Sequence, residues 1–200
     1  MKKFRVLLFG AVICLFLSGC GKKENRAIEQ KIVFICCYVG YAEGYHNSGY
    51  CIDNQGYKVE YDLTPKHITY QGMDRMELYE YLLEHLETLE RQPFLSEEEL
   101  RTCYNNLYEI DPEAKMESKL FAFDRSSYIL YGVQLSETGE PILVTLREDG
   151  SYLMRNTDEN AREIINLIGW NAWISGNRDD KAKDEWDGWN DTEGWKIWEW

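Results

Sequence analysis

The stretch from Tyr57 to Leu63 most constrains the fold, because apolar and charged residues alternate strictly along it. The apolar set is Tyr57, Val59, Tyr61 and Leu63, and the charged set is Lys58, Glu60 and Asp62. Side chains of a strand point alternately to its two faces, so this pattern predicts a strand with one packed face and one wet face. One-sided strands are typical of antiparallel sheets. The turn signal Asn54-Gln55-Gly56 precedes the stretch and predicts a hairpin over residues 50–63.

Other segments also have the features of strands. Residues from Ile32 to Val39 are apolar at both alternating sets, which is typical of a central strand. After residue 115 the segments with strand character are Leu120–Phe123, Tyr128–Leu135, Ile142–Leu146 and Tyr152–Met154. The last two flank Asp149-Gly150, a dipeptide that favours a hairpin turn. The sequence therefore predicts a run of antiparallel strands in its second half.

Helical periodicity marks three segments. The first has apolar residues at helical spacing, a capping box from Asp74 and Glu77, and an end at Pro93; its apolar residues are Met76, Tyr79, Leu82, Leu83, Leu86 and Leu89. The second begins at Ser96 and has an apolar face of Leu100, Cys103, Tyr104, Leu107 and Tyr108. The short link between them predicts an antiparallel helix pair. A third helix is expected over residues 158–168, ended by Gly169.

This order of elements predicts an α+β fold: a mostly antiparallel sheet with the helix pair and the C-terminal helix on one face. A helix pair followed by about four strands is similar to the module of β-lactamase inhibitory proteins and related small lipoprotein domains. The resemblance covers roughly residues 73–155 and rests on element order, with no shared motif. It therefore implies a fold and carries no function.

The first twenty residues have the features of an export signal. A basic start, Lys2-Lys3-Phe4-Arg5, is followed by an apolar run from Val6 to Leu17 that is too short to span a bilayer. The run ends in Leu17-Ser18-Gly19-Cys20, which resembles the lipobox of bacterial lipoproteins. The resemblance implies cleavage between Gly19 and Cys20 and diacylglyceryl attachment to Cys20. The expected location is the extracytoplasmic face of a bacterial membrane, held by lipid.

The chain that remains after cleavage is strongly acidic. After cleavage 19 basic and 35 acidic residues remain, a net charge of about −16. A surface this acidic excludes nucleic acid as a partner.

Composition predicts three segments after the export signal. Residues 20–30 are polar and predict a tether, and residues 31–170 predict one globular domain. Residues 171–200 form an acidic tail, rich in Trp, that is expected to be disordered.

Cysteines are the main candidates for covalent or metal chemistry. Cys36 and Cys37 are adjacent in a predicted strand and face opposite ways, so one of them shares a face with Cys51. A disulfide between Cys51 and one of that pair is expected, although four cysteines allow three full pairings that the sequence does not distinguish. A zinc site from Cys36 or Cys37, His46 and Cys51 matches no familiar spacing, so no metal or other cofactor is predicted.

Aromatic residues suggest binding surfaces. Tyr38, Tyr41, Tyr45 and Tyr50 bracket a loop that contains Gly40, Gly44 and Gly49. Together with Trp186 and Trp189 of the tail, Tyr41, Tyr45 and Tyr50 are candidate contacts for an envelope protein or glycan. The sequence lacks the common catalytic motifs, which favours a non-enzymatic binding or envelope-associated module. The alternative is a cell-envelope hydrolase or thiol enzyme that uses carboxylates or Cys103.

Overall fold

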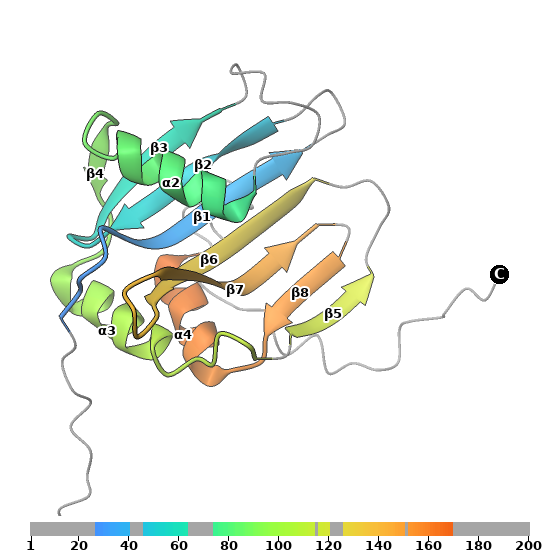
Figure 1. The fold of residues 1–200 in the computed structure, drawn as a ribbon. Coiled ribbons are helices and arrows are strands. Elements are labelled where there is room, and N and C mark those ends of the chain that lie inside the picture. Colours follow the sequence, from blue (N-terminus) through green and yellow to red (C-terminus); the bar gives the residue numbers. More distant parts are fainter. Residues whose placement is uncertain are drawn as a thin grey trace, which may run out of the picture.

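Eight antiparallel strands form one continuous sheet in the computed structural model, in the order β4-β3-β2-β1-β6-β7-β8-β5 (Figure 1). The structure describes residues 27–40, 46–63, 74–114, 116–120, 126–150 and 152–169. The strands are β1 (Ile32–Gly40), β2 (His46–Asp53), β3 (Tyr57–Asp62), β4 (Arg91–Pro93), β5 (Met116–Leu120), β6 (Ser127–Leu135), β7 (Pro141–Asp149) and β8 (Tyr152–Asn156). The helices are α2 (Arg75–His85), α3 (Glu97–Leu107) and α4 (Glu159–Ile168).

Local sequence signals act as predicted at the turns and helix ends. The segment Asn54–Gly56 joins β2 to β3, and Gly56 has the positive φ of 83° that favours glycine. Asp74 with Glu77, and Ser96 with Glu99, form complete capping boxes at the starts of α2 and α3. Gly169 ends α4 in the left-handed conformation, with a φ of 70°.

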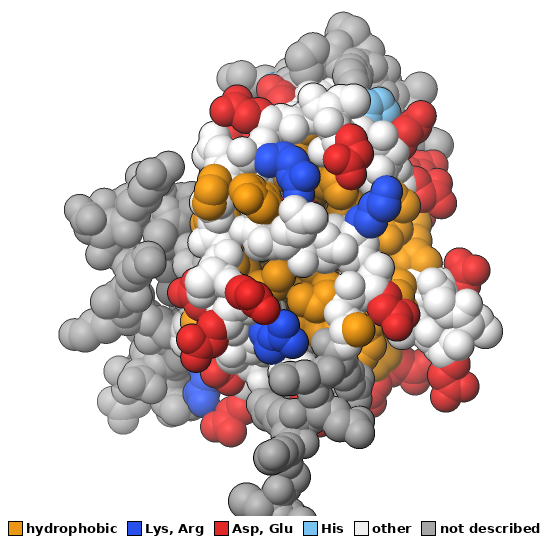
Figure 2. Space-filling model, turned by 90° about the vertical axis from the view of Figure 1, so that its left-hand side faces the viewer, with side chains coloured by type: hydrophobic (Ala, Val, Ile, Leu, Met, Phe, Trp, Pro, Cys, Tyr) orange, Lys and Arg blue, Asp and Glu red, His pale blue; other side chains and the backbone are white. Residues whose placement is uncertain are grey.

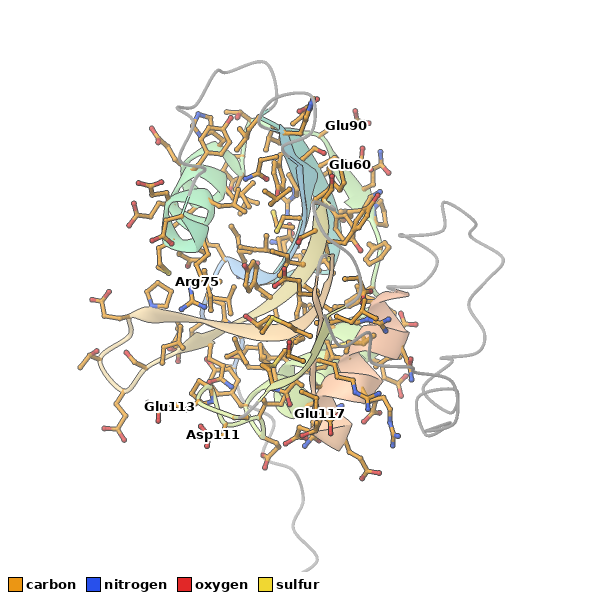
Figure 3. The ribbon with its side chains drawn as sticks, turned by 90° about the vertical axis from the view of Figure 1, so that its right-hand side faces the viewer. Glu60, Arg75, Glu90, Asp111, Glu113 and Glu117 are labelled. Atoms are coloured by element: carbon orange, nitrogen blue, oxygen red, sulfur yellow. The ribbon has the colours of Figure 1, made fainter. Side chains whose placement is uncertain are left out.

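The predicted α+β class is confirmed, but the helices lie on both faces of the sheet. Leu78, Tyr79 and Leu82 of α2 pack with Ile35, Cys37 and Cys51 on one face. The helices α3 and α4 pack with Phe34, Cys36 and Leu130 on the other face. Figure 3 shows the sheet from its β5 side, with α2 on one side and α4 on the other.

The prediction of an antiparallel helix pair from residues 74 to 108 is wrong, because a strand lies between the two helices. The link between α2 and α3 is not a simple loop, because Arg91–Pro93 forms β4 and pairs with β3 at the edge of the sheet. The chain thereby passes from one face to the other. The helix that packs beside α3 is α4, and Asn106 donates a hydrogen bond to Glu163 between them. The resemblance to β-lactamase inhibitory proteins, which rested on the helix pair, loses that support.

The helix α3 is fixed tightly on β6. Gly132 has no side chain where Leu107 packs, and a Cβ there would lie 2.3 Å from Leu107 Cδ1. The buried Gln134 side chain donates to the carbonyls of Leu107 and Ile110 at 2.6 and 2.8 Å. These bonds tie the last residue of α3 and the segment just after it to β6.

The domain begins earlier than the predicted boundary at residue 31. Gln30 is buried and donates to the carbonyl of Val133 at 2.7 Å. The Tyr104 hydroxyl lies 3.1 Å from both the Ala27 carbonyl and Gln30 Oε1. Residues 27–30, which were expected to belong to the tether, are therefore packed against the domain. Within the described ranges, no helix is long and apolar enough to cross a bilayer.

Candidate functional site

A row of polar and aromatic residues crosses five strands on the face that carries α3 and α4. We call this set the tyrosine row, and from β3 to β7 its members are Asp62, Ser48, Tyr38, Tyr128 and Asp149. Each lies directly opposite the next in the strand register, so their side chains share one face. Leu153 of β8 lies opposite Asp149 and extends the row. Asp62 is exposed and the other members are half-buried.

The adjacent row on the same face is buried at its centre. It contains Tyr50, Cys36 and Leu130, which pack in the core beneath α3 and α4. Glu60 lies at one end of this second row, and Figure 3 shows it on the α4 side of the sheet but toward the opposite end from that helix. The centre of the second row is buried, whereas the centre of the tyrosine row is half-buried, so burial beneath α3 and α4 decreases from the second row to the tyrosine row. The tyrosine row lies at the margin of the core, where side chains reach solvent.

Tyr38 and Tyr128 form the centre of the tyrosine row. Their ring centroids are 4.8 Å apart and the rings are tilted by 48°, a geometry within the favourable range for aromatic pairs. The Tyr38 hydroxyl donates to Ser126 Oγ at 2.9 Å. The pair is thus held in place by ring packing and by a hydrogen bond.

Arginines and carboxylates flank the tyrosine pair on one side. Asp149 accepts from Arg147 Nε at 2.9 and 3.2 Å. Arg147 lies directly opposite Arg155 of β8, and Glu117 of the edge strand β5 accepts from Arg155 at 2.8 and 3.0 Å. Each guanidinium therefore has a carboxylate partner, which offsets the repulsion between the two arginines. The arrangement supplies fixed hydrogen-bond donors and acceptors close to Tyr128.

The β4 edge of the sheet is a second surface with aromatic and basic groups. Phe94 is 38% exposed and packs edge-on against Tyr50, with the two ring centroids 5.7 Å apart. The guanidinium carbon of Arg91 lies 4.9 Å from the centroid of the Tyr57 ring. Figure 2 views this side of the molecule and shows apolar, basic and acidic side chains intermingled. Arg91 is paired with the buried carboxylate of Asp53. The basic group of this edge thus has a structural role in holding the β2–β3 turn.

Of the predicted binding residues, Tyr50 is the one that lies within the described part of the chain. Tyr50 is only 4% exposed and packs in the core, so its ring is not part of an open surface. Tyr41, Tyr45, Trp186 and Trp189 lie outside the described residues, as do Gly19 and Cys20. No local signal in the sequence marks Ser48, Tyr128 and Asp149, because only the long-range strand register brings them beside Tyr38.

The cysteines Cys36, Cys37, Cys51 and Cys103 are all buried free thiols, so the expected disulfide of Cys51 is not formed in the structure. The register gives the reason. Cys51 lies opposite Ile35, while Cys37 lies opposite Gly49, so these two cysteines are only diagonal neighbours. Diagonal neighbours are about 7–8 Å apart, which exceeds the span of a relaxed disulfide. Cys36 packs on the opposite face from Cys51.

Burial also determines the chemistry of these thiols. It raises the pKa of Cys37, Cys51 and Cys103 to about 12 in each case. Burial raises the pKa of Cys36 as well, although a hydrogen bond with Tyr50 opposes the shift. The reactive form of cysteine is the thiolate, so these four thiols are poor nucleophiles at neutral pH.

No group of three or more metal-binding side chains is positioned for a metal ion in the described part of the chain. The zinc ligands considered from the sequence are kept apart by the strand itself. His46 begins β2 and Cys51 lies five residues further along it, a separation of about 17 Å in an extended strand. Zinc ligands must lie within about 2.0–2.3 Å of one shared ion.

Comparison of the chain with protein-family models, with curated proteins and with solved structures found no match.

Proposed function

We propose that this chain is an exported lipoprotein, held at the outer face of a bacterial membrane by lipid on Cys20, and that it acts there as a non-enzymatic binding module. The lipobox Leu17-Ser18-Gly19-Cys20 supports export and lipidation. Two or more acyl chains, at about 0.8 kcal/mol per buried CH₂, hold a protein stably on a bilayer. With so acidic a chain the lipid provides the anchoring, because anionic head groups repel the protein.

The packing of residues 27–30 limits the distance between lipid and domain. Ala27 is bonded to Tyr104, so only residues 21–26 separate Cys20 from the packed domain. The seven Cα–Cα steps from Cys20 to Ala27 span at most about 25 Å when fully extended. The domain is therefore expected to stay near the membrane surface, within the layer of the envelope that adjoins it.

The tyrosine row is the single observation that carries the binding function. Tyr38 and Tyr128 are half-buried aromatic residues at the margin of the core, with Ser48, Asp62 and Asp149 beside them. Aromatic side chains surrounded by a few fixed polar groups are typical of recognition surfaces. A thiol enzyme is disfavoured by comparison, because the described thiols are buried and protonated.

Binding to the envelope tests the proposal. The lipidated chain would be isolated from membranes after mild cross-linking, alongside the Tyr128→Ala and Tyr57→Ala variants. Tyr57 is also half-buried but lies near Arg91 at the β4 edge, so it is a matched control. We expect Tyr128→Ala to lose cross-linked envelope material and Tyr57→Ala to retain it. Equal recovery with all three proteins, or a wild-type chain absent from the membrane fraction, would contradict the proposal.

A further inference from the structure

Residues 27–30, which we call the strap, lead into β1 beside α3 (Figure 1). The strand ladder starts after the strap, at Ile32, which pairs with Asp53. Within the strap, Ile28 is half-buried against the core and Gln30 is buried, while Ala27 and Glu29 are exposed. The strap therefore faces the domain with one apolar side chain and one polar side chain.

Two buried polar side chains hold the strap in place. The Gln30 amide donates to the carbonyl of Val133 at 2.7 Å. The Tyr104 hydroxyl lies 3.1 Å from both Gln30 Oε1 and the carbonyl of Ala27. A hydroxyl has one proton, so these two acceptors compete for a single donor. The strap is thus positioned by a small set of bonds, two of which share one hydrogen.

An attachment of this kind is readily reversible. Groups that leave a protein hydrogen bond regain bonds with water, so each such bond is worth only a factor of roughly 2 to 12 in an equilibrium constant. Ile28, the apolar contact, is half-buried and adds less than a fully buried side chain would. Together these contacts suit a released state that is populated at about 0.1–10%, the usual range for a functional minor conformation.

Lys31 marks the point at which release of the strap would stop. Its carbonyl accepts from the backbone N–H of Asn54 at 3.0 Å, and Ile32 beyond it is fully buried and paired. Residues 27–30 can therefore leave the domain while the sheet stays intact. Release lengthens the chain between Cys20 and the first fixed residue from seven Cα–Cα steps to eleven. The maximum span rises accordingly from about 25 Å to about 38 Å.

We propose that the strap is a latch, which opens without unfolding of the domain and thereby sets how far the domain reaches from its lipid anchor. The reach rests on the proposed function, because it requires lipid on Cys20, whereas the latch itself does not. The closed strap holds the domain close to the membrane. The open strap lets the domain follow a partner further into the envelope.

Thiol labelling at the strap tests the latch. Ile28→Cys places a thiol on the inward side of the strap in the full chain, and Cys36 and Cys103 of the same core cluster report any opening of the domain itself. At pH 7.5 we expect the thiol at position 28 to react at least about tenfold faster than Cys36 and Cys103, as a locally opening segment does. Low concentrations of urea should leave its rate unchanged, because release of the strap exposes little surface.

Two variants weaken the latch in different ways. Tyr104→Phe removes the shared hydroxyl but keeps the ring, and Gln30→Ala removes the amide. In the Ile28→Cys chain each should raise the labelling rate at position 28 about fivefold and leave Cys36 and Cys103 unchanged. Tyr38→Phe is the matched control, because its hydroxyl bonds to Ser126 rather than to the strap, and it should change the rate less than about twofold.

Three results would overturn the latch. The first is labelling at position 28 that is as slow as at Cys103 in every variant, because the strap would then open only with the domain. The second is an equal rise at position 28 and at Cys103 in Tyr104→Phe, which would show a general loss of stability. The third is a rate at position 28 that neither Tyr104→Phe nor Gln30→Ala changes.

Energy transfer separates the reach from the latch and from the proposed function. A donor dye at Glu98→Cys, in the exposed first turn of α3, and acceptor lipids in vesicles measure the height of the lipidated chain. We expect Gln30→Ala to lower the transfer and Tyr38→Phe to leave it unchanged. Equal transfer in all three proteins would overturn the reach but not the latch. A chain without lipid that does not bind vesicles would overturn the reach and the proposed function together, while labelling at position 28 would still report the latch.

Discussion

Leu107 of α3 packs directly on the backbone of Gly132 in β6, so that a Cβ at position 132 would lie 2.3 Å from Leu107 Cδ1. Leu107 is fully buried and cannot move away without disturbing the core around α3. The helix thus depends on the absence of a side chain at one position of a strand that is paired on both sides.

The first prediction follows from this contact. Gly132→Ala should lower the free energy of unfolding by about 1–3 kcal/mol through overpacking. Urea denaturation followed by far-UV circular dichroism measures it. The double variant Gly132→Ala with Leu107→Ala should lose less stability than the two single variants combined, because the smaller side chain leaves room. Strictly additive losses would show that the two residues do not interact.

The second prediction concerns Asp53, which is 1% exposed at the β2–β3 turn. Its carboxylate accepts from the backbone N–H groups of Gln55 and Tyr57 at 2.8 and 3.0 Å, and it is paired with Arg91. Asp53→Ala should cost about 2–4 kcal/mol, because it leaves turn donors without a partner. Glu60→Ala removes an ion pair whose carboxylate is 62% exposed and should change stability by less than about 0.5 kcal/mol. Equal effects in denaturant titrations would contradict this interpretation.

The third prediction is a loss of stability at alkaline pH. Burial raises the pKa of Cys37, Cys51 and Cys103 from 9.0 to about 12, and it raises the pKa of Tyr50 as well. A group with a raised pKa in the folded state contributes full stability below its unfolded value, and this contribution is lost as pH rises toward the folded value. Stability should therefore fall between about pH 9 and pH 12, and less steeply in Cys51→Ala.

Thiol labelling provides an independent check on the cysteines. At pH 7.5 a thiol reagent should leave Cys36, Cys37, Cys51 and Cys103 unmodified in the native chain and label all four after denaturation, as peptide mass spectrometry would show. Rapid native labelling of any of the four would contradict their description as buried thiols. A disulfide found at Cys51 in protein purified from the envelope would revive the bridge expected from the sequence.

The fourth prediction concerns the anchor. Cys20→Ser should abolish fatty-acyl labelling and leave the chain uncut or released from the membrane, because the thioether to diacylglycerol cannot form. The control is Cys103→Ser, which changes a buried cysteine of α3 that has no place in lipidation. Metabolic labelling followed by membrane fractionation measures both. Undiminished labelling of Cys20→Ser would end the lipoprotein interpretation.

Much of the fold could be predicted from local sequence signals. The capping boxes at Asp74 and Ser96 depend on residues three positions apart, and the turns at Gly56 and Gly150 join neighbouring strands. Each is a short-range signal, and each marks an element end in the structure. The alternation of Val59 and Tyr61 with charged residues likewise agrees with the buried and exposed faces of β3.

The missed features depend on long-range pairing. Tyr38 meets Tyr128 only because β1 pairs with β6, and no local pattern specifies that register. The placement of α2 on the opposite face from α3 depends on β4, three residues ending in Pro93, which in sequence resemble a helix terminator. The candidate site could therefore be predicted only in part: Tyr38 was noted in the sequence, while its partners come from four other strands.

The attachment of Gln30 and Ala27 to the domain also has a mechanical consequence. Force on the lipid anchor would enter the domain at the start of β1, which is paired with β2 on one side and β6 on the other. Because ladder hydrogen bonds are perpendicular to their strands, a pull along β1 loads many of them at once in shear rather than one after another. The strand that follows the proposed lipid anchor is thus the one best placed to bear tension.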